Sequence, residues 1–449
     1  MVQTSDRRRD WYLSNFEKFE KGLNGDAASH IHAIRKAAMA RFAELGFPTT
    51  HDEEWKYTDV SPIASVPFKH VLGYEPEGAT AKDVERFSFG NLHGARLVCV
   101  NGRFSEKLSS AGSFSAGVRM GSLAVALRNN DEVVLRHVAK YARYDDNAFT
   151  ALSTAFLRDG IFIYVPKGRL IETPIHLIFL STGLESEFVS YPRNLFVAEE
   201  NSQTTIIETH ASLANNTYFT NTVTEIVLGE NAIVEHEKLQ TESDHAFHVG
   251  MTYVQQNRNS SFTSHSISLG GALVRNNLTA VLDGEGAECT LNGLYAGMGD
   301  QHVDNHTTID HAKPHCSSHE LYKGILAGKS RGVFNGKIIV RKNAQKTDAK
   351  QTNKNLVLSN EASIDTKPQL EIFANDVRCT HGATIGQLDE EAIFYLRSRG
   401  IGLNKTRDIL VYAFASDVID RINVGPLREE FQQMLHAWLD RAHPVQADS

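Results

Sequence analysis

The central stretch of the chain, residues 160–387, is the feature that most limits its fold. Short alternating or apolar runs such as TTIIETH, VTEIVL, LTAVLD and KIIV follow one another there, separated by Gly, Asn, Asp and Ser turns. In the later part, residues at expected turns fall 17, 13, 18 and 15 positions apart: Pro314, Arg331, Ala344, Ala362 and Val377. These intervals are too long for tight hairpins and suit successive rungs of a solenoid. We therefore expect a mainly β fold with a parallel β-helix core over 160–387, and a large β-sandwich is the alternative.

Helical patterns precede this stretch. Apolar residues recur at three- and four-residue steps within residues 11–45, and shorter helical patterns follow at 132–143 and 149–157. A strand and turn are expected at 95–105. We therefore expect a mostly helical N-terminal domain with a short strand segment over residues 1–159.

Helical patterns also follow the central stretch, and they predict a C-terminal helical domain over residues 388–449. Asp389 and Asn404 are placed to cap its first two helices, Gly400 ends the first, and Pro426 opens the third. The third helix carries one apolar stripe, formed by Leu427, Phe431, Met434, Leu435, Trp438 and Leu439. We expect this stripe to be core or to cover the end of the solenoid, with a partner surface as the alternative.

Charge and composition restrict the classes of function. The formal net charge is -8 and the one short basic run, Arg7 to Arg9, is isolated, so nucleic acid is not an expected partner. No apolar segment follows that run, and no stretch approaches the ~18 apolar residues that span a bilayer. The four cysteines are widely scattered and form no C-x-x-C pair: Cys99, Cys289, Cys316 and Cys379. We expect a cytoplasmic protein without membrane contact.

The sequence GILAGKS, residues 324–330, is similar to the end of a phosphate-binding loop. Its spacing fails, because Lys323 stands where the first glycine is required. The residues that follow predict a strand and not the helix whose N-terminus would hold phosphate. We therefore expect no ATP site in this chain.

A histidine-rich tract at residues 300–320 is the densest group of metal-ligating residue types. It contains His302, His306, His311, His315, Cys316 and His319. In a strand, His302, Asp304 and His306 would share one face. The tract bends at Pro314 and mixes faces, so its histidines need not converge. We expect a polar outer face of a solenoid rung, with a shared metal site as the alternative.

The segment NDVRCTHGATIG, residues 375–386, places Cys379 and His381 two positions apart. In a strand both would project on the same side, with backbones roughly 6.5 to 7 Å apart, so both could reach one metal ion. Two ligands are half of a site, since zinc or the iron of a cluster normally takes four donors. From the spacing alone, a structural strand end, half of a metal site and a nucleophilic cysteine all stay open.

Several long strings of residues carry a resemblance to a known family. They are EEWKYTDV (53–60), DGIFIYVPKG, VFNGKIIVRKNAQKTDAKQTNKNLVLS (333–359), IDTKPQLEIFANDVRCTHGAT and EAIFYLRSRGI. From about residue 50 to its end, the chain resembles the SufB/SufD family of iron-sulfur cluster assembly scaffolds. The resemblance implies a right-handed parallel β-helix flanked by helical domains, and a non-enzymatic subunit of the SUF complex. In that complex SufB and its paralogue pair through their β-helices, and each carries a SufC ATPase, here on helices within about 391–422.

The same resemblance assigns roles to particular residues. Cys379 and His381 correspond to residues of the family's cluster site, so they are the expected metal ligands, and no catalytic residue is implied. SufB has a cysteine where this chain has Ala362, and a glutamate where it has Gly382. This chain therefore matches the other branch of the family and should not assemble a cluster alone. The implied cofactor is a nascent iron-sulfur cluster shared transiently with SufB. Reduced flavin is implied for the assembled complex, with no residue of this chain assigned to it.

Two other classes of function are considered. A metal-dependent β-helix enzyme, such as a polysaccharide lyase, would need carboxylates and basic groups clustered in a cleft, and no segment locates such a cluster. A homodimeric protein that delivers iron or flavin would use the tract at 302–319. A solenoid edge that normally pairs with SufB can also pair with a second copy of this chain when SufB is absent.

Overall fold

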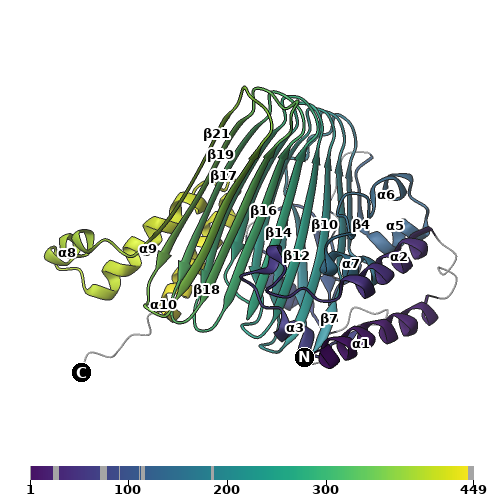
Figure 1. The fold of residues 1–449 in the computed structure, drawn as a ribbon, viewed down its shortest axis with the longest axis horizontal. Coiled ribbons are helices and arrows are strands. Elements are labelled where there is room, and N and C mark those ends of the chain that lie inside the picture. Colours follow the sequence, from purple (N-terminus) through teal and green to yellow (C-terminus); the bar gives the residue numbers. More distant parts are fainter. Residues whose placement is uncertain are drawn as a thin grey trace.

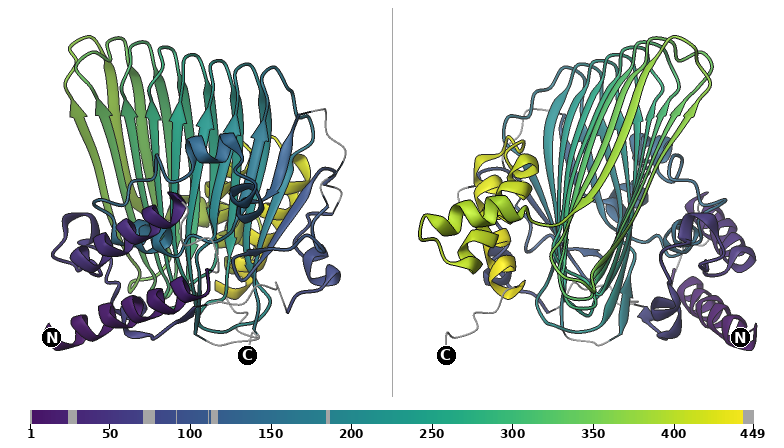
Figure 2. Two further views of the ribbon diagram at one scale, coloured as in Figure 1. Left: turned by 90° about the vertical axis from the view of Figure 1, so that its right-hand side faces the viewer. Right: turned by 60° about the vertical axis from the view of Figure 1, so that its left-hand side comes forward.

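A computed structural model gives the fold of residues 2–23, 30–70, 78–90, 92–110, 112, 117–183 and 187–442, with side chains from residue 9 onward. The side chains of Arg7 and Arg8 in the basic run lie outside this description. Two long sheets form a β-helix, and helices from the two ends of the chain lie on its opposite flanks (Figures 1 and 2). No helix in the described ranges is long and apolar enough to cross a membrane.

The chain passes alternately through the two sheets. The first sheet contains, in spatial order, β20 (Ser363–Ile372), β18 (Arg331–Val340), β16 (His302–His311), β14 (Leu273–Leu282), β12 (Phe247–Gln256), β10 (Tyr218–Leu228), β8 (Arg193–Ala198), β5 (Ile161–Val165) and β4 (Arg119–Ser122), with β7 (Phe188–Ser190) and β1 (Lys69–His70) beside this path. The second contains β21 (Arg378–Gly386), β19 (Asp348–Val357), β17 (Ser317–Leu326), β15 (Glu288–Gly297), β13 (Ser261–Ser268), β11 (Ile233–Thr241), β9 (Gln203–Ser212), β6 (Ile175–Ser181), β2 (Arg96–Val100) and β3 (Arg103–Phe104). All pairs are parallel except β4 with β5 and β2 with β3.

Successive turns of the β-helix lie in register. Arg275 on β14 is beside Asp304 on β16, 29 residues later, and Glu320 on β17 is beside Gln351 on β19, 31 residues later. The expected solenoid is therefore confirmed, and the sandwich alternative is wrong because neighbouring strands are parallel. The turn markers found in the sequence are half a turn apart, since each one lies just before a strand or at its first residue, and these strands alternate between the two sheets.

Alternation of side chains builds the interior. On β16, Val303 and Ile309 point inward with apolar residues of both sheets, including Leu291 and Phe334, and form one continuous core. Strands β6, β8 and β10 are buried on both faces, because helices cover their outer side. This double burial explains the nearly continuous apolar run IHLIFLS of β6.

The N-terminal helices are α1 (Val2–Lys21), α2 (His30–Leu45), α3 (Ser61–Ser65), α4 (Ala81–Glu85), α5 (Leu123–Arg128), α6 (Glu132–His137) and α7 (Ala148–Ala155), with a 3-10 turn, η2 (Glu53–Trp55). Aromatic residues of α1, α2 and α7 pack on the outer face of the first sheet, against Phe219 and Val249. The helix expected at 132–143 ends early at His137. The helix does not continue, because Val138 is extended and Ala139 has a φ of 57°. In this conformation the backbone N–H groups of residues 139, 141 and 142 donate hydrogen bonds to the Glu225 carboxylate.

The C-terminal helices are α8 (Glu390–Ser398), α9 (Leu403–Ile419) and α10 (Gly425–Ala442). Asp389 caps α8 through the N–H of Glu391, as predicted. The prediction that Asn404 caps the next helix is wrong, because α9 begins one residue earlier and Gly402 occupies the cap position. The apolar stripe of α10 is core: it packs with α9 on the outer face of the second sheet, against Leu239 and Ile267, and so covers a face of the β-helix and not its end.

Glu225 on β10 joins the N-terminal region to the β-helix. Its carboxylate accepts hydrogen bonds from the backbone N–H groups of Ala139, Tyr141 and Ala142 at 2.8 to 3.1 Å. It also pairs with Arg193 Nη2 at 2.8 Å, and both side chains are fully buried.

We expect Glu225→Ala to lower the free energy of unfolding by about 3–5 kcal/mol, because Arg193 is left buried without its carboxylate. Urea unfolding measures this loss. The control is Glu230→Ala, which removes an exposed carboxylate paired with Arg258 and should change the stability little. Equal losses in the two variants would contradict the role given to Glu225.

Candidate functional site

Cys379 and His381 lie on β21, the last strand of the β-helix. Strand β21 pairs with β19, with Cys379 beside Ala349 and His381 beside Gln351. Ala349 and Gln351 are buried and point into the β-helix. Because parallel strands in register orient their side chains alike, Cys379 and His381 also point toward the interior. The two residues therefore share one side of the strand, as predicted, at the last turn.

This end of the β-helix is open. Within the described ranges, β20 pairs only with β18 and β21 only with β19, so both have a free edge. Most of β21 is exposed, and large apolar side chains are exposed beside it: Ile385 is 54% and Phe373 62% accessible. A free sheet edge with exposed apolar residues is typical of a surface that another chain covers.

The thiol of Cys379 is half-buried among apolar residues, including Leu370 and Val377. Burial raises the pKa of this thiol, and the nearby carboxylate of Asp348 raises it further. The thiol is therefore protonated in the isolated chain at neutral pH, and it must lose this proton to become a metal ligand. In the described part of the chain, no three His, Cys, Asp or Glu side chains are grouped so that they could hold a metal ion.

The histidine-rich tract does not converge on one point. His302 and His306 lie with Asp304 on the outer face of β16, as predicted. The other three, His311, His315 and His319, lie in the interior, in a turn and on the outer face of β17. The five histidines of the tract therefore do not share one face of the β-helix.

The motif EEWKYTDV covers part of this polar face. Thr58 Oγ1 donates to Asp304 Oδ2 at 2.5 Å, and Asp304 pairs with Arg275 Nη1 at 2.9 Å. The Arg275 guanidinium lies 3.8 Å from the centre of the Trp55 ring. Although burial opposes ionisation, Arg275 and His306 hold the pKa of Asp304 below its usual range. This part of the motif ties the N-terminal region to the β-helix.

The motif GILAGKS contains the end of β17 and the turn that follows, and the predicted strand, β18, comes next. The Ser330 hydroxyl is buried and donates to the backbone oxygen of Gly297. This serine is engaged in closing a turn of the solenoid.

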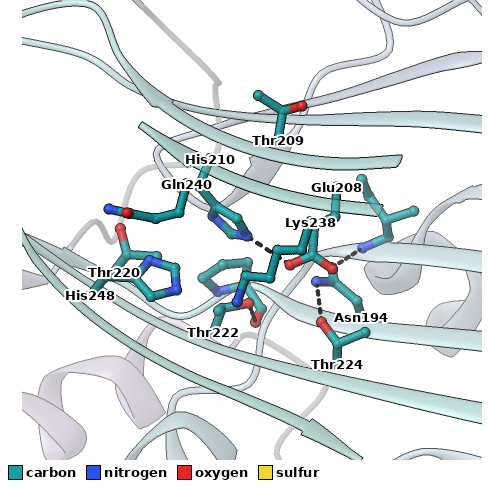
Figure 3. Close-up of polar contacts among 12 residues, drawn as sticks. Asn194, Glu208, Thr209, His210, Thr220, Thr222, Thr224, Lys238, Gln240 and His248 are labelled. Carbon is teal, nitrogen blue, oxygen red and sulfur yellow. Dashed lines mark hydrogen bonds and ion pairs between the residues drawn. The ribbon is translucent and has the colours of Figure 1, made fainter. Parts of the chain in front are cut away.

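A second group of titratable residues, which the sequence reasoning missed, is enclosed in the β-helix (Figure 3). Glu208 on β9 accepts hydrogen bonds from His210 Nε2 at 2.7 Å and from His236 Nε2 at 3.2 Å. Glu242, after β11, accepts from His248 Nδ1 at 2.6 Å. Burial opposes ionisation, but these imidazoles lower the pKa of both carboxyl groups, that of Glu242 to about 2.

Only one weak signal for this group is present in the sequence. Alternation in TTIIETH places Ile206, Glu208 and His210 on one face, and a strand is normally expected to turn its polar face to solvent. Here the opposite face, with Ile207, is buried under the C-terminal helices. Because both faces are buried, the polar residues enter the interior and need partners from neighbouring turns.

Buried imidazoles predict how stability depends on pH. Burial lowers the pKa of His70 and His176 to about 3 and that of His248 and His311 to about 4. In the unfolded chain these groups titrate near pH 6.5. The unfolded state therefore binds more protons below pH 6.5, and the free energy of unfolding should fall as the pH falls from 6.5 to 4.

Urea unfolding at pH 7 and pH 5 measures this effect. His311→Gln should reduce the difference between the two pH values, whereas His51→Gln, at an exposed position, should leave it unchanged. A chain that is more stable at pH 5 than at pH 7 would contradict the prediction.

Comparisons with known proteins agree with this architecture. Residues 6–177 match the SufBD protein N-terminal region, and residues 179–414 match the core domain described as SUF system FeS cluster assembly, SufBD core domain. An iron-sulfur cluster assembly SufBD family protein of Synechocystis is 34% identical over 420 residues, which cover 92% of each chain. The iron-sulfur cluster assembly protein SufD of Escherichia coli is 33% identical over 87% of this chain and 89% of its own. SufD of Bacillus subtilis is 26% identical over 71% and 73%.

The fold and the matches define one class of protein, the β-helix proteins of iron-sulfur cluster assembly. The chain belongs to the SufBD family, and it is similar to SufD proteins over most of its length.

Proposed function

We propose that this chain is a scaffold subunit of the SUF complex that contributes Cys379 and His381 to a nascent cluster at its interface with SufB. The observation that carries the proposal is the placement of both residues on the inward side of the last, uncovered turn. A thiolate and a neutral imidazole are both competent iron ligands. The chain supplies two donors, so the remaining donors come from SufB.

Pairing at this end would complete both the fold and the site. The free edges of β20 and β21 carry backbone groups that a second β-helix can bind, and Ile385 and Phe373 supply apolar contact area. Contact with SufB also removes water from around Cys379. To bind a metal there, Cys379 would have to lose the thiol proton, which burial favours. The role is that of a scaffold, and ATP is hydrolysed by SufC.

The docking surface for SufC is proposed on α8 and α9. On α8, Ile393 is buried, whereas Phe394 and Tyr395 are 75% and 58% accessible. On α9, Val411 and Ala415 pack on the β-helix with α10. The exposed aromatic pair therefore lies on a helix whose neighbour is anchored, which suits transmission of movement from an ATPase to the β-helix.

The first test concerns the ligands. In the complex purified with SufB and SufC, we expect His381→Ala and Cys379→Ser each to lower the cluster content by about tenfold or more, because each removes one donor from the iron. Absorption spectra and iron and sulfide analysis measure the content. Thr380→Ala, which lies between the two and is exposed like His381, is the matched control. Normal cluster content in His381→Ala would remove this residue from the site.

The second test separates the two partner surfaces. We expect Phe394→Ala with Tyr395→Ala to lose SufC and keep SufB, because these side chains supply exposed apolar contact area on α8. Phe373→Asp with Ile385→Asp should weaken the contact with SufB and keep SufC. Co-purification measures both, and each pair is the control for the other. Loss of SufB from the first pair, or of SufC from the second, would contradict the assignment.

A further inference from the structure

Gln351 is the inward-facing neighbour of His381 on the adjacent strand β19. We propose that Gln351 is a positioning residue, whose side-chain oxygen accepts a hydrogen bond from one ring N–H of His381 while the other ring nitrogen binds the metal. This inference rests on the proposed function, because it concerns the same site. Neither the spacing in the sequence nor the family resemblance assigned a role to Gln351.

The register places the two side chains within reach of each other. Paired strands are about 4.8 Å apart, and both side chains project to the inner side of the sheet. Gln351 is 1% accessible, whereas His381 is exposed, so the amide lies on the interior side of the imidazole. The amide therefore forms part of the floor beneath the proposed ligands.

The hydrogen bonds of Gln351 leave its oxygen available. Its Nε2 donates to Glu320 Oε2 on the preceding turn at 2.7 Å. This hydrogen bond sets the orientation of the amide, with the nitrogen toward Glu320. Its Oε1 is buried and has no hydrogen-bond partner in the described part of the chain. A buried carbonyl oxygen without a partner is costly, by about 1–3 kcal/mol, so a new donor beside it is favoured.

The opposite wall of the β-helix leaves space for this amide. Gly336 on β18 faces it, and a Cβ atom built on Gly336 would overlap the Gln351 Nε2. Glu320 is buried, and burial raises the pKa of its carboxyl group to about 7. Gln351 is thus held between a carboxyl group on one neighbouring turn and a glycine on the facing sheet.

The chemistry of metal-bound histidine gives this arrangement a purpose. A histidine that binds a metal through one ring nitrogen donates its other N–H to an acceptor, which fixes the tautomer and the orientation of the ring. An exposed side chain on an edge strand lacks such restraint. Gln351 Oε1 would supply it when the imidazole lies over the amide.

Pulsed electron paramagnetic resonance of the reduced cluster tests the inference in the complex with SufB and SufC. The remote nitrogen of a bound imidazole has a quadrupole coupling that reports its hydrogen bond. We expect Gln351→Met, which keeps the length but removes the acceptor, to shift this coupling and to lower the cluster content about tenfold. The exchanged pair Glu320→Gln with Gln351→Glu keeps both the hydrogen bond and an acceptor at 351, and should restore both values.

The control is Gln256→Met, since Gln256 is also a buried, inward glutamine but lies on β12. It should leave the coupling unchanged. If Gln351→Met does not assemble, Gly336→Ala displaces the same amide and should shift the same coupling. A coupling that His381→Ala abolishes but Gln351→Met and Gly336→Ala leave unchanged would overturn this inference alone. Normal cluster content in His381→Ala would instead overturn the proposed function.

Discussion

In-register stacking of parallel strands is the constraint on which the rest of the structure depends. Every inward side chain lies over its equivalent in the preceding turn, so each turn is positioned by the one before it. The last turn, with β20 and β21, has a neighbour on one side only within the described chain. Cys379 and His381 lie on this last turn. The turn before it positions their side chains, and no later turn of the described chain covers them. The proposed metal site and the uncovered end of the solenoid thus lie at the same place.

Polar groups inside the β-helix show how such stacking accommodates charge. In the interior, Glu208 and Glu242 are each held by imidazoles. On the outer face of β10, under the N-terminal region, Glu225 is held by Arg193 and three backbone N–H groups. A buried carboxylate without such partners would be neutralised or would unfold the chain. These pairs join turns and domains that are distant in sequence. Interior polarity toward the open end, at Glu320 and Gln351, continues the same pattern up to the proposed ligands.

Protonation of Cys379 fits a subunit that offers ligands only when it is assembled. A thiol with a raised pKa resists oxidation and binds metal poorly while the end of the β-helix is open. When a partner closes this end and supplies further donors, a metal ion would compete better with the proton for the sulfur of Cys379. The same half-buried position therefore protects the thiol in the free chain, and it is compatible with the proposed coordination in the complex.

The sequence by itself determined the solenoid, the helical zones and the shared side of Cys379 and His381, because these follow from local periodicity, turn spacing and the alternation of a strand. It also indicated that His302, Asp304 and His306 share a face. Only the tertiary structure decided the early end of the helix at His137, the inward orientation of the Glu208 and His210 side chains, and the position of Gln351 beneath His381. Those features depend on residues about 30 positions or more away along the chain, and a local pattern carries no information on which side chain a later turn will place beside an earlier one.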